Sequence, residues 1–289
     1  MPEGVPSIDR VADQGDDRWP AAFTPGNAQW SGHLPTLTDA PEALALAYYR
    51  AAWQVLDGAP GPRAAALLDP VRTRAHLLAG EATDFRAVEA YVVLTGDLDL
   101  LAEKAGGATV LDRLRGLPDG GTVALDAARV GRARSLAALL RRLGERDEAA
   151  AIEVAAAEDA RGVLARYAGG GRWRTAETPD DLAAAFRAVA GEMPEFLDLL
   201  QRGELVEFAD RQLGAEPPGG VAYALCRLGR PDRAAVLLAG AASPGAAELE
   251  AILGGLFAIR ADFPGWEAGS RRVTRPGLGR LENLPAALT

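Results

Sequence analysis

The sequence predicts an all-α protein, a toroid of antiparallel helical hairpins with little or no sheet, and three observations predict it. The hydrophobic residues, 48% of the chain, are mainly Ala and Leu, which favour helices, rather than the Val, Ile and Thr that favour strands. Leu136, Leu139, Leu140 and Leu143 recur at the spacing of one helix face. Gly144 follows where a left-handed residue ends a helix, and a second helical pattern starts at once.

In the N-terminal half, the first helix is predicted to begin in the segment Thr38–Glu42 and to run to Leu56. That segment supplies a capping residue, a proline and an acid, which together favour a helix start. A return helix over residues 63–79 is interrupted at Pro70, which lacks a backbone N–H. Asp84 is predicted to cap the next helix. The last two helices of this half are predicted over residues 85–94 and 98–114.

The centre of the chain is predicted to be a tight hairpin of two long helices, over residues 122–143 and 145–167. The three glycines at 169–171 end the second helix. A further helix is predicted over residues 178–201, with a break near Pro194. The shorter helices that follow are predicted over residues 204–213, 219–228, 231–239 and 245–259.

The chain is predicted to divide into three parts. Residues 1–35 form an extended arm, since they are rich in Pro, Gly and Asp and show little periodicity. Residues 36–262 form the helical domain. Residues 263–289 form a tail of loop with one or two short strands near Val273 and Leu281, because the composition changes abruptly at Arg260.

Two architectures accept such hairpins, a closed toroid and an open superhelix like that of tetratricopeptide repeats. The pattern L-G-x4-A occurs at two turns, in residues 143–149 and 228–234, and suits either. The hairpins differ in length and show no constant period near ~34 residues. The sequence therefore favours the closed toroid over the open array.

Charge and composition exclude several classes of protein. The net charge of -9 argues against a nucleic-acid or anionic membrane surface, since both need a concentrated basic face. The single cysteine, Cys226, excludes an internal disulfide. The two histidines, His33 and His76, have no second ligand at metal spacing, and no phosphate-binding or dinucleotide-binding glycine loop is present. We expect a cytoplasmic protein without metal or cofactor that binds a small molecule.

Five groups of residues are predicted to lie at the mouth of the toroid, where aromatic rings and carboxylates together suit a carbohydrate. They are Trp30 with His33, Glu81 and Asp84 with Arg86, Asp119 with Asp126, Arg172 with Trp173, and Glu216.

Several of these residues also have a structural interpretation. Asp84 is placed to cap a helix, and Asp119 beside a glycine is typical of a turn. Trp30 and His33 can pack over one mouth of the core, as can Trp173. Asp126 is harder to explain structurally, because aspartate is a poor residue inside a helix unless it caps or pairs. Its candidate partner is Arg129, about one turn away.

Four stretches, residues 94–101, 124–143, 145–173 and 221–238, resemble the helical barrel of bacterial six-hairpin, (α/α)6 glycosidases of the trehalase, glucosidase and debranching-enzyme type. The phrases that carry the resemblance are L-T-G-D-L-D-L-L, A-L-D-A-A-R-V-G-R-A-R-S-L-A-A-L-L-R-R-L-G, E-A-A-A-I-E-V-A-A-A-E-D-A-R with R-W-R-T, and V-A-Y-A-L-C-R-L-G-R-P-D-R-A-A-V-L-L. With G-G-L-F-A-I-R-A-D-F-P-G-W near the end, the resemblance covers roughly residues 38–285.

The resemblance implies a substrate held at the mouth of the barrel and an inverting mechanism that uses one carboxylic acid and one carboxylate about 6.5–9.5 Å apart. It places Asp126 on the V-D-L segment that begins the third inner helix of the family. Asp119 or Asp126 would then donate the proton, and Glu81, Asp84 or Glu216 would act as the base. The loop that carries the general acid in the family is here shortened to residues 117–121, and the loop before the fifth inner helix to residues 216–220.

Three hypotheses follow from the sequence. The first is a glycoside hydrolase, with Trp30, His33, Arg86, Arg129, Arg172 and Trp173 binding the sugar. The second is a barrel of the same fold that binds or cyclises a small molecule with one acid. The third is a helical-repeat scaffold for protein partners.

Overall fold

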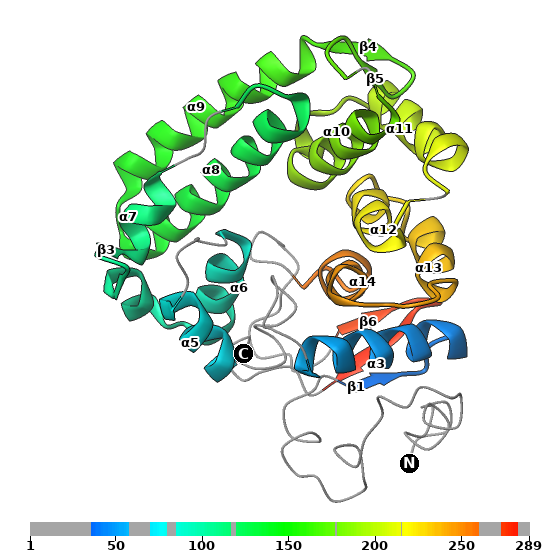
Figure 1. The fold of residues 1–289 in the computed structure, drawn as a ribbon, viewed down its shortest axis with the longest axis horizontal. Coiled ribbons are helices and arrows are strands. Elements are labelled where there is room, and N and C mark those ends of the chain that lie inside the picture. Colours follow the sequence, from blue (N-terminus) through cyan, green and yellow to red (C-terminus); the bar gives the residue numbers. More distant parts are fainter. Residues whose placement is uncertain are drawn as a thin grey trace, which may run out of the picture.

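The structure, a computed structural model, describes residues 36–57, 70–79, 85–116, 120–176, 178–214, 216–259 and 273–282. These residues are mostly helical, which confirms the predicted all-α class (Figure 1). The α-helices are α3 (Glu42–Asp57), α5 (Pro70–Ala79), α6 (Phe85–Thr95), α7 (Val110–Arg115), α8 (Val123–Leu143), α9 (Arg146–Leu164), α10 (Pro179–Glu192), α11 (Leu199–Gln212), α12 (Pro218–Arg227), α13 (Pro231–Ala239) and α14 (Ala246–Glu250). Two 3-10 helices, η2 (Leu98–Ala102) and η3 (Pro194–Phe196), and a π-helical segment, η4 (Ala251–Leu256), complete the helical elements described.

The helices form two layers along an arc, as Figure 1 shows. In the inner layer α6, α8, α10, α12 and α14 pack against one another in that order, and α3 packs against α14. Helices α5, α9, α11 and α13 each pack against the inner helix next to them in the chain. The repeated unit is therefore a helical hairpin with one inner and one outer member.

The central hairpin of α8 and α9 forms as predicted. The hydroxyl of Thr122 accepts a hydrogen bond from the N–H of Leu125, 3.2 Å away, and so caps the start of α8. Gly144 ends α8 in the left-handed conformation, with φ of 89°, which costs glycine no steric strain. Helix α9 begins two residues later and runs back along α8.

The prediction of one helix over residues 98–114 is wrong. Gly106 and Gly107 lie there with φ values of 62° and 94°, a conformation that breaks a right-handed helix. They form the turn of a small hairpin between β2 (Lys104–Ala105) and β3 (Ala108–Thr109), so that helical structure is confined to η2 before the hairpin and α7 after it.

The helix predicted over residues 178–201 is also divided differently. Helix α10 ends at Glu192, and a new helix, α11, starts at Leu199 because Asp198 and Gln201 form a reciprocal capping box. The glycines at 169–171 form the turn of a hairpin between β4 (Tyr167–Gly169) and β5 (Arg172–Trp173). The predicted helix over residues 245–259 consists of α14 followed by η4.

A three-stranded antiparallel sheet joins the two ends of the described chain. Its order is β1 (Thr36–Thr38), β7 (Gly279–Glu282) and β6 (Val273–Arg275). Leu37 pairs with Leu281, and both side chains are fully buried against the core. The hydroxyl of Tyr49 on α3 accepts a hydrogen bond from the N–H of Leu37 at 3.2 Å. The sheet thus anchors the segment before α3.

The core is one continuous cluster of buried side chains, dominated by Leu, Ala and Val. Its largest fully buried side chains include Tyr48 on α3, Phe186 on α10 and Phe208 on α11. In the described stretches, no helix combines the length and the apolar character needed to cross a bilayer.

Asp97 joins α5, α6 and η2 at one point. Its carboxylate accepts hydrogen bonds from Nε of Arg74 at 3.0 Å, from the hydroxyl of Tyr91 at 2.9 Å and from the N–H of Leu100 at 3.3 Å. The hydrogen bond from Arg74, supported by the bond from Tyr91, lowers the pKa of Asp97. These contacts hold η2 against the α5–α6 hairpin.

We expect Asp97→Asn to lower the free energy of unfolding by about 1–2 kcal/mol at pH 7, because the charge-assisted bond to Arg74 is lost. The folded-state pKa of Asp97 lies below its unfolded value of about 3.9. The contribution of the carboxylate is therefore complete above that value and is lost as the pH falls through the folded-state pKa. Urea unfolding from pH 7 to pH 2.5 measures this. The difference from the unmutated protein should shrink at acid pH, whereas the exposed neighbour Asp99→Asn should change little throughout. A loss that is independent of pH would contradict the assignment.

Candidate functional site

A pocket with two adjoining compartments lies on the inner side of the helical arc. The smaller, about 270 Å³, lies between α6, α8 and α10. The larger, about 500 Å³, lies between α8, α10, α12 and α14 and includes Arg86 of α6. Arg86, Ala128 and Glu192 line both compartments, so the two adjoin at these residues.

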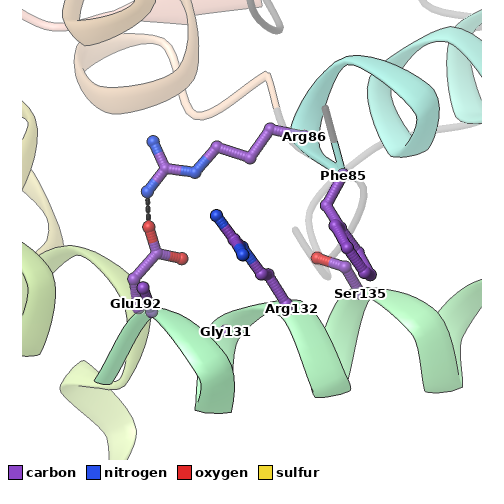
Figure 2. Close-up of a pocket in the computed structure, with 7 residues that line it drawn as sticks. Phe85, Arg86, Gly131, Arg132, Ser135 and Glu192 are labelled. Carbon is purple, nitrogen blue, oxygen red and sulfur yellow. Dashed lines mark ion pairs between the residues drawn. The ribbon is translucent and has the colours of Figure 1, made fainter. Parts of the chain in front are cut away.

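Arg86 is the centre of this site. Its guanidinium pairs with the carboxylate of Glu192 on α10, as the dashed line in Figure 2 marks, and lies 4.0 Å from that of Glu250 on α14. The same guanidinium stands 6.0 Å from the ring centre of Tyr223 on α12, within the range of a cation–π contact. The side chains of Glu192 and Glu250 are only 14% and 7% exposed. Three inner helices therefore meet through one arginine and two shielded carboxylates.

Small residues create the space for these charged groups. A Cβ added to Gly131 of α8 would lie 2.9 Å from Cβ and 3.0 Å from Cδ of Glu192. A Cβ added to Gly220 of α12 would lie 2.8 Å from Cδ of Arg187. Both glycines are in helices, where alanine is the more stable residue by about 1 kcal/mol. Glycine is needed here because a charged side chain from α10 occupies the place of the missing methyl group.

Two further carboxylates contact residues that line the larger compartment and serve structural purposes. Glu216 pairs with Arg187. Glu248, which is buried, accepts hydrogen bonds from the N–H of Gly219 at 2.9 Å and of Gly245 at 2.8 Å. It thereby caps the starts of α12 and α14 together.

The smaller compartment has its own set of polar groups. Arg132 of α8 stacks over the ring of Phe85, 5.5 Å from the ring centre, and its guanidinium points into the pocket toward Arg86 (Figure 2). Ser135, one turn further along α8, donates a hydrogen bond of 2.5 Å to the buried carboxylate of Glu89. Among the described residues, Arg132 forms no ion pair.

The backbone next to Glu250 departs from α-helical geometry. Glu250 is the last residue of α14, and the π-helical segment η4 follows directly. Ala258, just past η4, has φ of 55°, a left-handed conformation that costs a non-glycine residue about 1–2 kcal/mol. Single π-helical turns and strained residues both concentrate at functional sites, where they fix the direction of a side chain.

The sequence-predicted site residues are dispersed in the structure. Arg86 lines the pocket, whereas Asp126 does not. The carboxylate of Asp126 accepts hydrogen bonds from the N–H of Gly121 at 3.1 Å and from Arg166 at 2.5 Å. Arg129 pairs with Asp159 of α9, Nε to Oδ2 3.2 Å, so the predicted pairing of Asp126 with Arg129 is wrong. Asp126 instead joins the start of α8 to the end of α9.

The remaining candidates lie at other places. Arg172 is exposed on β5. Trp173 is 3% exposed and packs edge-on against Tyr167, with ring centres 5.3 Å apart, so its ring belongs to the core. Glu216 is held by Arg187 beside the pocket. The five others lie outside the described residues and remain predictions: Trp30, His33, Glu81, Asp84 and Asp119.

Sequence reasoning missed most of the residues that form the pocket, namely Arg132, Arg187, Glu192, Tyr223 and Glu250. A signal for two of them is visible in the sequence. Glu192 follows the apolar run A-V-A-G, and Glu250 precedes A-I-L-G-G-L. A carboxylate on the apolar face of a helix needs a partner to be buried. The partner itself, Arg86, is distant in the chain and can be identified only from the fold.

Comparisons of the chain with protein-family models, with curated proteins and with solved structures gave no match. Within the described ranges, no three His, Cys, Asp or Glu side chains are grouped so that they could hold a metal ion. The chemistry of the site is therefore derived from the pocket itself.

We expect Gly131→Ala to destabilise the protein by about 1–3 kcal/mol, because the new methyl group must displace the Glu192 side chain, including its Cβ. Gly203→Ala is a matched control, since Gly203 lies exposed in α11 and an added Cβ meets nothing within 4 Å. That change should stabilise by about 0.5–1 kcal/mol. Urea unfolding of both variants gives the comparison. Equal stabilisation by both would show that Gly131 is not needed to seat Glu192.

Proposed function

We propose that this chain binds a carbohydrate or another small polyhydroxylated molecule in the two-compartment pocket. The observation that carries the proposal is Arg86 between the shielded carboxylates of Glu192 and Glu250. Sugar hydroxyls both donate and accept hydrogen bonds, and this arrangement offers guanidinium donors beside carboxylate acceptors within one ligand's reach.

The walls of the pocket suit the same class of ligand. Alanines and glycines of four helices line the larger compartment, and the ring of Tyr223 adds a flat apolar surface. A sugar ring presents apolar C–H faces and a polar rim, so it matches a site with apolar walls and a few convergent charged groups. The volumes of about 270 and 500 Å³ fall near or within the range of small-molecule sites.

Hydrolysis of a glycoside is a second candidate function, and the pair Glu192 and Glu250 favours it. The two side chains come from different helices, flank one arginine and are shielded from water. In an inverting mechanism one would protonate the leaving oxygen and the other would activate a water molecule on the opposite side of the sugar. Asp126 is a weaker candidate for the acid, since it does not line either compartment and its carboxylate is held by Arg166 and the N–H of Gly121.

We further infer that the helical arc closes into the predicted (α/α)6-type toroid. Arg86 of α6, near one end of the arc, reaches Glu250 of α14. Helix α14 in turn packs against α3 at the other end. Closure would place α3 beside α5 and α6 and would seal the pocket at its side, whereas the alternative of an open superhelical scaffold would leave these ends free.

A distance measurement between the two ends tests this closure. With Cys226 replaced by Ala, spin labels on Ala43→Cys of α3 and Ala79→Cys of α5 would sit at two exposed positions. A closed toroid fixes the relative position of α3 and α5, so a single narrow distance distribution is expected. A broad distribution would indicate free ends and would favour the open scaffold.

Binding is tested by calorimetry with a panel of neutral monosaccharides, disaccharides and methyl glycosides. We expect binding by at least one member, and a loss of about tenfold or more in affinity for Glu192→Gln and for Glu250→Gln, because each change removes an acceptor and its pairing with Arg86. Glu207→Gln is the control, since Glu207 is 70% exposed on α11 and pairs with Arg211 at 3.8 Å.

The same variants separate binding from hydrolysis. If the unmutated protein releases reducing sugar from a glycoside and Glu192→Gln or Glu250→Gln does not, while the variant still binds the glycoside with part of the original affinity, the acid–base roles are supported. If no sugar binds, the proposed function is wrong. If turnover occurs but only Asp126→Asn abolishes it, the pocket is the wrong site and the sequence-based assignment is the better one.

A further inference from the structure

We propose that the natural ligand carries one anionic group, a carboxylate or a phosphate, which sits against Arg132 in the smaller compartment while its neutral part occupies the larger one. This inference rests on the proposed function and narrows it to an acidic sugar or a sugar phosphate. The two compartments differ in charge.

The smaller compartment has an excess of positive charge. Its charged lining residues are Arg86 and Arg132 against Glu192 alone, a formal charge of +1. The larger compartment has Arg86 and Arg187 against Glu192 and Glu250, a formal charge of zero. An anion is therefore matched by the first compartment and a neutral polyol by the second.

Arg132 is placed to receive that anion. The residue is half-buried, and its guanidinium lies over the Phe85 ring and points toward Arg86 (Figure 2). Among the described residues it has no carboxylate partner, although the chain as a whole carries nine more acidic than basic side chains. Arg86 is already paired with Glu192, so an anion in this compartment would be held chiefly by charge-assisted hydrogen bonds from Arg132.

The contact with Phe85 does not use the hydrogen-bond donors of Arg132. Its Cζ atom lies over the ring, 5.5 Å from the ring centre, and the guanidinium N–H groups remain available to a ligand. This planar fork fits the two oxygens of a carboxylate or of a phosphate equally well. The guanidinium therefore favours a negatively charged ligand group, and the experiment must show whether that group is a carboxylate or a phosphate.

The experiment compares matched ligands on the full chain by calorimetry: glucose, glucuronate and glucose 6-phosphate, with the corresponding galactose series. We expect at least one acidic member to bind about tenfold to a hundredfold more tightly than its neutral counterpart. Arg132→Gln should bring this ratio close to one. Arg142→Gln removes the same charge from an exposed position in the last turn of α8 and should leave the ratio unchanged.

Arg132→Lys distinguishes a loss of binding from a loss of folding, because it retains the positive charge but lacks the planar guanidinium. An intermediate ratio in this variant, with an unchanged thermal melting curve, would support the proposal. A preference for carboxylate is distinguished from a preference for phosphate by comparing glucuronate with glucose 6-phosphate: the preferred group is the one whose sugar binds more tightly relative to the neutral sugar. Equal binding of neutral and acidic sugars would overturn the anionic group and leave the proposed function intact, whereas binding of none of the sugars would overturn both.

Discussion

Short side chains on the facing surfaces of the helices determine how closely the helices pack and where space remains. Ala149, Ala156 and Ala160 form the buried stripe of α9 against α8, and such small residues let helix axes approach to about 8 Å. Where the facing side chain is also small, as at Ala128 and Ala184, the contact is left unfilled and becomes the wall of the pocket. One compositional feature therefore accounts for both the compact outer hairpins and the hollow inner side.

The two buried acids of α14 have partners that differ in mobility. Glu248 and Glu250 are two residues apart on α14 and are similarly buried, at 7% and 6% exposure. Glu248 is held by the fixed N–H groups of Gly219 and Gly245, which cannot leave without unfolding two helix starts. Glu250 instead faces Arg86, a long and partly exposed side chain that can change rotamer. A ligand can therefore compete for the second carboxylate but not for the first.

The sequence predicted what depends on neighbours in the chain and missed what depends on the fold. The leucine spacing before Gly144 and the Thr178 cap identify α8 and α10, because helix ends are set by local hydrogen bonds. In residues 98–114 the apolar spacing predicts one continuous helix. Gly106 and Gly107 adopt the left-handed conformation there and interrupt it. For the site, the sequence pattern favours acids at helix starts such as Asp126, and these are also the positions where acids cap and pair. The pocket acids depend on Arg86, which no local pattern connects to them.

The charges of the pocket are placed against the preference of their own helices. Arg86 is the second residue of α6, and Glu192 is the last residue of α10. A helix start favours a negative side chain and a helix end a positive one, by about 0.3–1 kcal/mol each. Both residues have the opposite sign, and each is stabilised mainly by the other across the pocket. Exchanging the two charges would satisfy both helices, but it would place a carboxylate at position 86 beside Glu250 and Tyr223, so the contacts across the pocket outweigh the preference of each helix. Local preferences are overridden most often at functional sites, and here the override brings a guanidinium from α6 and a carboxylate from α10 together in one pocket.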